Sequence, residues 1–354
     1  MRRLHGHLPR SPADLLEEAA AWCRSTGAEL DVYGTGAVLT DLEARVAGLL
    51  GFPAARFVPS GTMAQPIALR VWADRSRTRT VGMHPTSHLE LHEERGYAHL
   101  HGLHATLVGP AHRPILASDL DRVVEPLAAL VVELPAREIG GQLPSWDELE
   151  ALKATAAERG IPLHLDGARL WECEAAYGRP LDAICRGFAS AYVSFYKGIG
   201  ALPGAMLLGD ADLVARAAVW QRRQGGTVWT QIAGVASASA RLDTARERMP
   251  GALEHARALA QAIAGVQGVR VVPDPPHVAM FHVVGELDPE AAQAGRLRAQ
   301  EATGIDPFPG PRPGPVPGTF RVEIYVADAG REVRPDEAAM AWRVALGVDG
   351  TGPG

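Results

Sequence analysis

Hydrophobic positions along the first two thirds of the chain alternate between helical spacing and short apolar runs. Helical spacing marks residues 13–25 and 41–50, the second with Thr40 or Asp41 as its N-cap, and another helix follows the segment FVPSGT to about residue 73. The clearest later helix covers residues 147–159. This alternation predicts an α/β domain around a mostly parallel sheet with helices on both faces. The apolar runs are RTVGM, ATLVG, AALVVEL, IPLHLD, SAYVSF and GAMLLG.

The pattern changes after about residue 227. An Ala-rich helical stretch runs to about residue 265, with a break predicted at residues 249–251. Three apolar runs and two helices, near 289–302 and 335–346, predict a smaller α+β domain. The predicted boundaries are an N-terminal segment at 1–30, a large domain at 31–240, a small domain at 241–346 and a flexible tail at 347–354.

Composition excludes several classes of protein. A hydrophobic content of 47% and a net charge of −6 are those of a globular protein, and give no electrostatic reason to expect nucleic acid or an anionic membrane as a partner. The chain begins with basic residues but no apolar core, which argues against a signal peptide, and no apolar run is long enough to span a membrane. Three cysteines without framework spacing predict reduced thiols and a cytoplasmic location.

Two local motifs have both a structural and a chemical interpretation. In VPSGTMAQPIAL, the residues Ser60, Gly61 and Thr62 lie where a helix begins, so they form either an N-cap with a glycine turn or an anion site. In IPLHLDGARLWE, Asp166 ends an apolar strand, where open α/β sheets bind ligands. Its alternative role is an internal salt bridge to Arg169.

Lys197, in VSFYKGIG, also follows an apolar strand. It is either a solvated lysine, a lysine paired with a buried acid, or a nucleophilic amine. Together, a phosphate cradle, a strand-end carboxylate and a strand-end lysine are what pyridoxal 5′-phosphate requires. The lysine forms a Schiff base with its aldehyde, the carboxylate keeps the pyridine nitrogen protonated, and the helix start binds the phosphate.

In these motifs the sequence resembles the threonine aldolase/β-eliminating lyase branch of the fold-type I pyridoxal phosphate enzymes. The resemblance covers about residues 31–209 and is most specific in LHLDGARLWE and SFYKGIGALPGAMLLG. A weaker match follows later in the chain, at FRVEIYVAD. It implies a large domain with a mostly parallel seven-stranded sheet, a smaller C-terminal α+β domain, and a homodimer or homotetramer.

The resemblance also implies a role for each matching residue. Lys197 would bond to the cofactor, Asp166 would pair with its pyridine nitrogen, and His88 would stack on its ring and assist proton movement. Arg169 would lie beside the cofactor and the substrate carboxylate, which Arg321 would also bind. The phosphate would be held by Ser60, Gly61 and Thr62.

The implied activity is cleavage of the Cα–Cβ bond of a 3-hydroxy amino acid, such as L-threonine or L-allo-threonine, to glycine and an aldehyde. The chain departs from the family at its start, where no serine matches the family's substrate-binding serine and the role is not transferred to Ser11. It also departs at VELPAREIGGQLP, where Arg137 stands near the family's histidine and only Glu133 of the motif is retained. These departures leave open another reaction of the same cofactor (transaldol transfer, β-elimination, racemisation or transamination) and, more remotely, a non-catalytic binding protein.

One metal-binding alternative comes from His84, His88 and His92, which are spaced by four as on one helix face. Pro85 disfavours helix at His84, and no cysteine or carboxylate completes a ligand set, so no metal is expected.

Overall fold

In this computed structural model, residues 1–348 are described, and most of the tail predicted at 347–354 lies outside them. The chain divides into two compact units. Unit 1 comprises residues 1–9, 139–142 and 248–354, and unit 2 comprises residues 10–138 and 143–247. None of the described helices is long and apolar enough to cross a membrane.

Unit 2 is built on a seven-stranded sheet of order β2-β8-β7-β6-β5-β3-β4, in which β8 runs antiparallel to both of its neighbours and the other pairs are parallel. This confirms the predicted mostly parallel sheet. The strands are β2 (Ala54–Val58), β3 (Thr80–Met83), β4 (His104–Leu107), β5 (Leu130–Glu133), β6 (Leu163–Gly167), β7 (Ser190–Ser194) and β8 (Ala205–Gly209).

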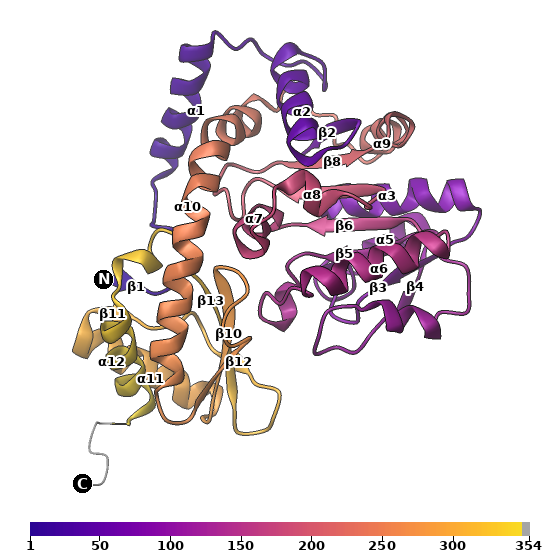
Figure 1. Ribbon diagram of the computed structural model, residues 1–354. Helices are drawn as coiled ribbons and strands as arrows, with labels where there is room; N and C mark the ends of the chain where they lie inside the picture. The colour runs from indigo at the N-terminus through magenta and orange to yellow at the C-terminus, as the bar shows by residue number, and fades with distance from the viewer. Residues whose placement is uncertain (349–354) are drawn as a thin grey trace. The chain divides into compact units, whose positions relative to one another are not determined.

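Helices cover both faces of this sheet, with α3 behind it and α6, α7 and α8 in front in Figure 1. The helix α3 packs on β2, β7 and β8, and its apolar side chains share a buried cluster with Tyr192 and Leu207. The helices of unit 2 are α1 (Pro12–Thr26), α2 (Ala37–Leu50), α3 (Gly61–Ser76), α4 (His88–Leu91), α5 (Gly96–His101), α6 (Trp146–Glu158), α7 (Cys173–Tyr177), α8 (Leu181–Cys185) and α9 (Ala211–Arg223), with short 3₁₀ turns at Ala117–Arg122, Arg137–Ile139 and Leu170–Glu172.

Unit 1 contains a four-stranded antiparallel sheet of order β12-β13-β10-β9 and the helices α11 and α12, which confirms the predicted α+β character of this part. Its core includes Phe281, Phe308, Phe320 and Trp342, all fully buried. Its elements are β1 (Arg2–Arg3), β9 (Val269–Val272), β10 (Met280–Gly285), α11 (Pro289–Thr303), β11 (Ile305–Asp306), β12 (Arg312–Pro313), β13 (Phe320–Tyr325), a 3₁₀ turn at Gly330–Glu332 and α12 (Pro335–Leu346).

Two predicted helix boundaries are wrong. The helix α2 begins at Ala37, with Gly36 as its N-cap, and not at Thr40 or Asp41. The predicted break at residues 249–251 is absent, because α10 (Ile232–Ala264) continues through Pro250. A proline inside a helix removes one backbone hydrogen bond, and burial of Leu253 and neighbouring residues on the same helix offsets that loss.

Candidate active site

Several side chains of the candidate site lie at the carboxyl ends of the neighbouring strands β5, β6 and β7. Glu133 on β5 is the register partner of Asp166 on β6, and Asp166 is the partner of Tyr192 on β7. Register partners on parallel strands point to the same face of a sheet. These three side chains therefore lie next to one another at one edge, as the crevice rule for open α/β sheets predicts.

Asp166 is held by two hydrogen bonds. Its side chain is 1% exposed, its Oδ1 accepts from the backbone N–H of Ala168 at 3.1 Å, and its Oδ2 accepts from Nε2 of Gln65 at 3.0 Å. Burial raises the pKa of Asp166, while the positive charge of Lys197 opposes that rise. The positive charge of Lys197 therefore acts on this buried carboxylate, and the salt bridge to Arg169 that the sequence left open is neither confirmed nor contradicted.

Lys197 lies just beyond β7, with its Nζ 5.8 Å from the centroid of the Tyr192 ring. Burial lowers the pKa of Lys197, which raises the share of neutral, nucleophilic amine, while Asp166 opposes the shift. The chain has one other lysine, Lys153. Its Nζ donates to Oε1 of Glu150 at 2.9 Å and to the Ile184 carbonyl at 3.0 Å, which gives it a structural role.

The charges of Arg169 and Glu133 also act on the pKa of Lys197. The charge of Arg169 lowers the pKa of Lys197 and that of Glu133. Burial, with the neighbouring charge of Asp166, nevertheless raises the pKa of Glu133 to about 8. The Oε1 of Glu133 accepts from the backbone N–H of Arg137 at 3.1 Å.

His88 contacts Glu93, whose charge acts on Asp166 and Lys197. The Nδ1 of His88 lies 3.3 Å from Oε1 of Glu93, whose side chain is only 4% exposed. The negative charge of Glu93 contributes to raising the pKa values of both Asp166 and Lys197. His88 opens α4, and its ring centroid lies 4.9 Å from that of His92.

The start of α3 supplies backbone donors. Ser60 is the N-cap, and its Oγ accepts from the N–H of Met63 at 3.3 Å. The N–H groups of Gly61 and Thr62 belong to the first turn, where a helix offers no intrahelical acceptor. A Cβ on Gly61 would lie 2.1 Å from Oη of Tyr192, so only glycine fits beside that phenol. The N-cap interpretation is correct, and it does not use the two N–H groups that an anion would need.

Arg321 lies in the other unit, on β13, where its register partners are Val284 on β10 and Arg312 on β12. Its side chain is half-buried. The role in substrate binding that the resemblance implies for Arg321 stays a prediction.

The segment that departs from the family forms an ion-pair network. Nη1 of Arg137 donates to Oε1 of Glu138 at 3.0 Å, and Nε2 of His92 lies 2.8 Å from the same oxygen. Ser11 has a structural function, because its Oγ accepts from the N–H of Asp14 in a capping box at the start of α1.

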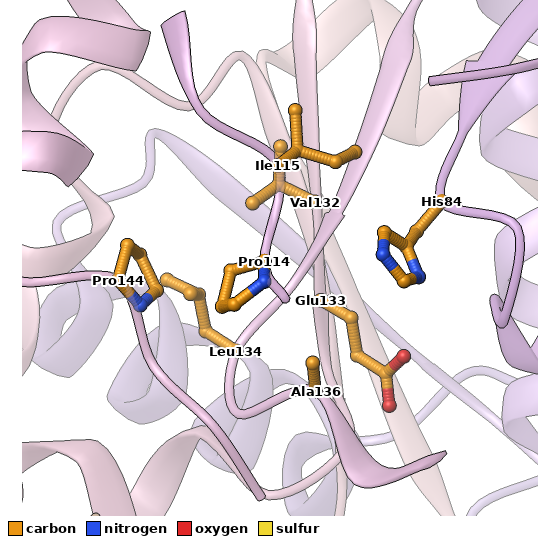
Figure 2. A pocket seen from close by; sticks show the side chains of 8 residues that line it. All are labelled: His84, Pro114, Ile115, Val132, Glu133, Leu134, Ala136 and Pro144. Carbon is orange, nitrogen blue, oxygen red and sulfur yellow. The ribbon is translucent and has the colours of Figure 1, made fainter. Parts of the chain in front are cut away.

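A pocket lies between His84 and the end of β5. Figure 2 shows the Glu133 carboxylate on the same side as His84, with apolar side chains on the other side. The Nε2 of His84 lies 2.9 Å from the carbonyl oxygens of both Pro110 and Arg113, and burial lowers the pKa of His84. These contacts do not support the metal-binding alternative, and residues 1–348 contain no cluster of three or more potential metal-ligating side chains. The apolar lining comprises Pro114, Ile115, Val132, Leu134, Ala136 and Pro144.

Sequence reasoning missed Gln65, Glu93 and Tyr192. Gln65 lies in the motif VPSGTMAQPIAL, one turn into α3, and its polarity on a buried face was a usable signal. Tyr192 precedes Lys197 by five residues in an apolar run. Nothing local distinguishes it from a packing residue, since its contact with Gly61 joins segments more than a hundred residues apart.

The residues of unit 2 fit pyridoxal 5′-phosphate. The aldehyde needs an amine, and Lys197 supplies a half-buried one with a lowered pKa. The pyridine nitrogen needs a carboxylate, which Asp166 supplies, held by two hydrogen bonds, and the phosphate needs donors such as the first N–H groups of α3. All the predicted site residues except Arg321 belong to this unit.

Comparisons with known proteins agree with this assignment. A family model described as beta-eliminating lyase matches residues 15–285. The aldolase vrtJ of Penicillium aethiopicum is 34% identical over 70% of this chain, and the match spans 65% of its length. The low-specificity L-threonine aldolase 1 of Arabidopsis thaliana is 29% identical over 73% of this chain and 74% of its own length. The crystal structure of a candidate L-allo-threonine aldolase from Listeria monocytogenes has a TM-score of 0.91 and 38% identity, covering 98% of this chain and 96% of that one.

Proposed function

The chain belongs to the β-eliminating lyase family of pyridoxal 5′-phosphate-dependent enzymes, and from this we propose that it cleaves the Cα–Cβ bond of a small 3-hydroxy amino acid, L-threonine or L-allo-threonine, to glycine and an aldehyde. The observation that carries the proposal is the charge interaction between the half-buried amine of Lys197 and the buried carboxylate of Asp166, at the ends of adjacent strands. The names of the relatives from Arabidopsis and Listeria support this substrate class.

The chain's own residues would hold the cofactor as the resemblance implies. Lys197 would bond to the aldehyde, Asp166 would face the pyridine nitrogen, and His88 would stack on the ring. Ser60 and Thr62 would contact the phosphate together with the N–H groups at the start of α3. When bound, the cofactor supplies an electron sink for the bond that breaks at Cα.

Proton handling would fall to half-buried groups of the site. Burial lowers the pKa of Lys197, which makes its amine a better proton donor and a larger share of it neutral. Glu133, with a pKa raised to about 8, holds a proton at neutral pH and can donate it. Arg169 and Arg321 would orient the substrate carboxylate, and that orientation decides which bond at Cα is cleaved.

A second candidate is another reaction of the same cofactor, namely transaldol transfer, β-elimination, racemisation or transamination. The observation that favours it is the segment after β5, where Arg137 and Glu138 form an ion pair in place of the family's histidine. Aldehyde release distinguishes the two candidates. If L-threonine, L-allo-threonine and phenylserine release no aldehyde while the cofactor spectrum changes, the second candidate replaces the first.

We also propose a homodimer or homotetramer in the cytoplasm. An exposed apolar patch on unit 2 supports self-association: Tyr33 is 55% exposed, Trp229 is 57% exposed, and their rings meet edge to face at 5.5 Å. The three cysteines are free thiols, in agreement with a reducing compartment. Light scattering of the purified protein tests the assembly, and a monomeric mass contradicts it.

The two-lysine composition makes the covalent test unusually clear. Purified protein is mixed with pyridoxal 5′-phosphate, reduced with borohydride, digested and analysed by mass spectrometry, with the Lys197→Ala and Lys153→Arg variants in parallel. We expect the label on the Lys197 peptide, no label and no turnover in Lys197→Ala, and normal labelling in Lys153→Arg. Absence of label in the wild type contradicts the proposed function.

A further inference from the structure

Tyr192 is placed against the predicted cofactor residues on three sides. It is the register partner of Asp166, and the Lys197 Nζ lies 5.8 Å from its ring centroid. Its hydroxyl reaches the first residue of α3, since a Cβ on Gly61 would lie 2.1 Å from the phenol oxygen. One side chain therefore spans the distance from the carboxylate strand to the start of the helix.

The hydroxyl of Tyr192 lies where α3 offers its unused donors. Ser60 Oγ already accepts from Met63, and the N–H groups of Gly61 and Thr62 have no acceptor within the helix. The helix has sixteen residues, so its dipole also favours an anion at this end. Burial raises the pKa of Tyr192 well above its ordinary value, so its phenol keeps its proton and can donate a hydrogen bond.

Packing explains the ring of Tyr192 but not its hydroxyl. The ring lies in an apolar cluster with Ala64, Ile67 and Ala168, and is 1% exposed. A phenylalanine would fill that cluster equally well, whereas a buried hydroxyl costs free energy unless it is hydrogen-bonded. The phenol also interacts with the side chains of Ser194 and Tyr196, so a purely internal hydrogen-bond network is the competing explanation.

We propose that Tyr192 is a cofactor-binding residue whose phenol hydroxyl donates a hydrogen bond to the phosphate of pyridoxal 5′-phosphate at the start of α3. The proposal rests on the proposed function, because it requires that the site takes this cofactor. It assigns to the phosphate a neutral side-chain donor from β7, in addition to the backbone and hydroxyl groups of Ser60, Gly61 and Thr62. A side chain at position 61 would occupy the space that the phenol of Tyr192 fills.

The test compares two ligands that differ only in the phosphate. Dissociation constants of pyridoxal 5′-phosphate and of pyridoxal are measured by fluorescence on the apoenzyme, for the wild type and Tyr192→Phe. Loss of a hydrogen bond to a charged group is expected to weaken pyridoxal 5′-phosphate by about 10-fold or more and to leave pyridoxal unchanged within about twofold. The matched control is Tyr177→Phe, which removes a hydroxyl that donates to the Pro144 carbonyl, and should change neither constant.

The outcomes separate this inference from the proposed function. If both ligands weaken equally in Tyr192→Phe, or if neither weakens, the hydroxyl serves the internal network and the inference is overturned. If the wild type binds neither ligand, the proposed function itself fails. The ³¹P NMR resonance of the cofactor bound to the holoenzyme gives a second measurement, and we expect it to shift in Tyr192→Phe but not in Tyr177→Phe. An unchanged resonance also overturns the inference.

Discussion

Glu133 and Asp166 are direct register partners at the carboxyl ends of β5 and β6, so two carboxyl groups face the same side of the sheet as neighbours. Burial and the charge of Asp166 raise the pKa of Glu133 to about 8, although Lys197 and Arg169 oppose the rise. At neutral pH these raised pKa values therefore favour a proton on this pair of carboxyl groups.

Replacing Glu133 with Gln should stabilise the apoprotein increasingly as pH rises. A carboxyl whose pKa is raised by folding costs stability above its unfolded pKa, near 4.5, and the cost grows until the pH reaches about 8. The upper bound on the slope is about 1.4 kcal/mol per pH unit, and solvent access reduces it. We expect the melting temperature of Glu133→Gln minus that of the wild type to be larger at pH 8 than at pH 5. A difference that is independent of pH contradicts the raised pKa.

Replacing Gly61 with Ala should damage both stability and cofactor binding. The new Cβ would lie 2.1 Å from the phenol oxygen of Tyr192, and overpacking of this kind costs about 1–3 kcal/mol. Gly96 is the matched control, because a Cβ there would meet only a Leu100 methyl group at 4.0 Å. Thermal unfolding and cofactor titration of both variants provide the measurement. Equal effects of Gly61→Ala and Gly96→Ala would mean that the contact with Tyr192 is relaxed at no cost.

Replacing Gln65 with Leu should destabilise the apoprotein, and increasingly so as pH rises, whereas Glu133→Gln should stabilise it. The amide of Gln65 donates to the Asp166 carboxylate and lowers its pKa, so the variant leaves a buried charge less well satisfied. Loss of a hydrogen bond to a buried charged group costs about 1–3 kcal/mol. We expect a loss of apoprotein stability that is greater at pH 8 than at pH 5, and a fall in kcat/KM of about 10-fold or more.

The control for Gln65→Leu is Gln142→Leu, which removes a donor to the neutral Ile139 carbonyl. Its effect on stability should depend less on pH, because the Ile139 carbonyl that loses its donor carries no charge. If the two variants show the same pH dependence, Gln65 does not stabilise the charged form of Asp166.

The positions of Asp166 and Lys197 at the ends of neighbouring strands were predictable, because each follows an apolar run in the sequence. Asp166 after LHL and Lys197 after SFY needed only the rule that ligands bind beyond the carboxyl ends of strands. Tyr192 was not predictable, since its significance comes from a contact with Gly61 across two elements. The start of α2 at Ala37 was missed because its N-cap, Gly36, offers no side chain to signal it. Pro250 led to the opposite error, because its strong local preference against helix is outweighed by burial along α10.

Arg321 provides the strictest test of the role that the family resemblance gives to unit 1. Replacing it with Lys keeps the charge but removes the planar fork that binds a carboxylate through two parallel hydrogen bonds. If Arg321 binds the substrate carboxylate in both the ground state and the transition state, KM should rise by about 10-fold or more and kcat should change less. Cofactor affinity should stay unchanged. Steady-state kinetics with L-threonine and L-allo-threonine measure the split between KM and kcat.

Arg312 is the matched control for Arg321, because it is the register partner on β12 and its side chain is exposed. Arg312→Lys changes the same chemical group on the neighbouring strand, so it reproduces any general effect of arginine loss on this sheet. We expect its KM to equal that of the wild type. Equal rises in KM for both variants would assign the effect to the general loss of a guanidinium group from this sheet. An unchanged KM in Arg321→Lys would remove Arg321 from the substrate site.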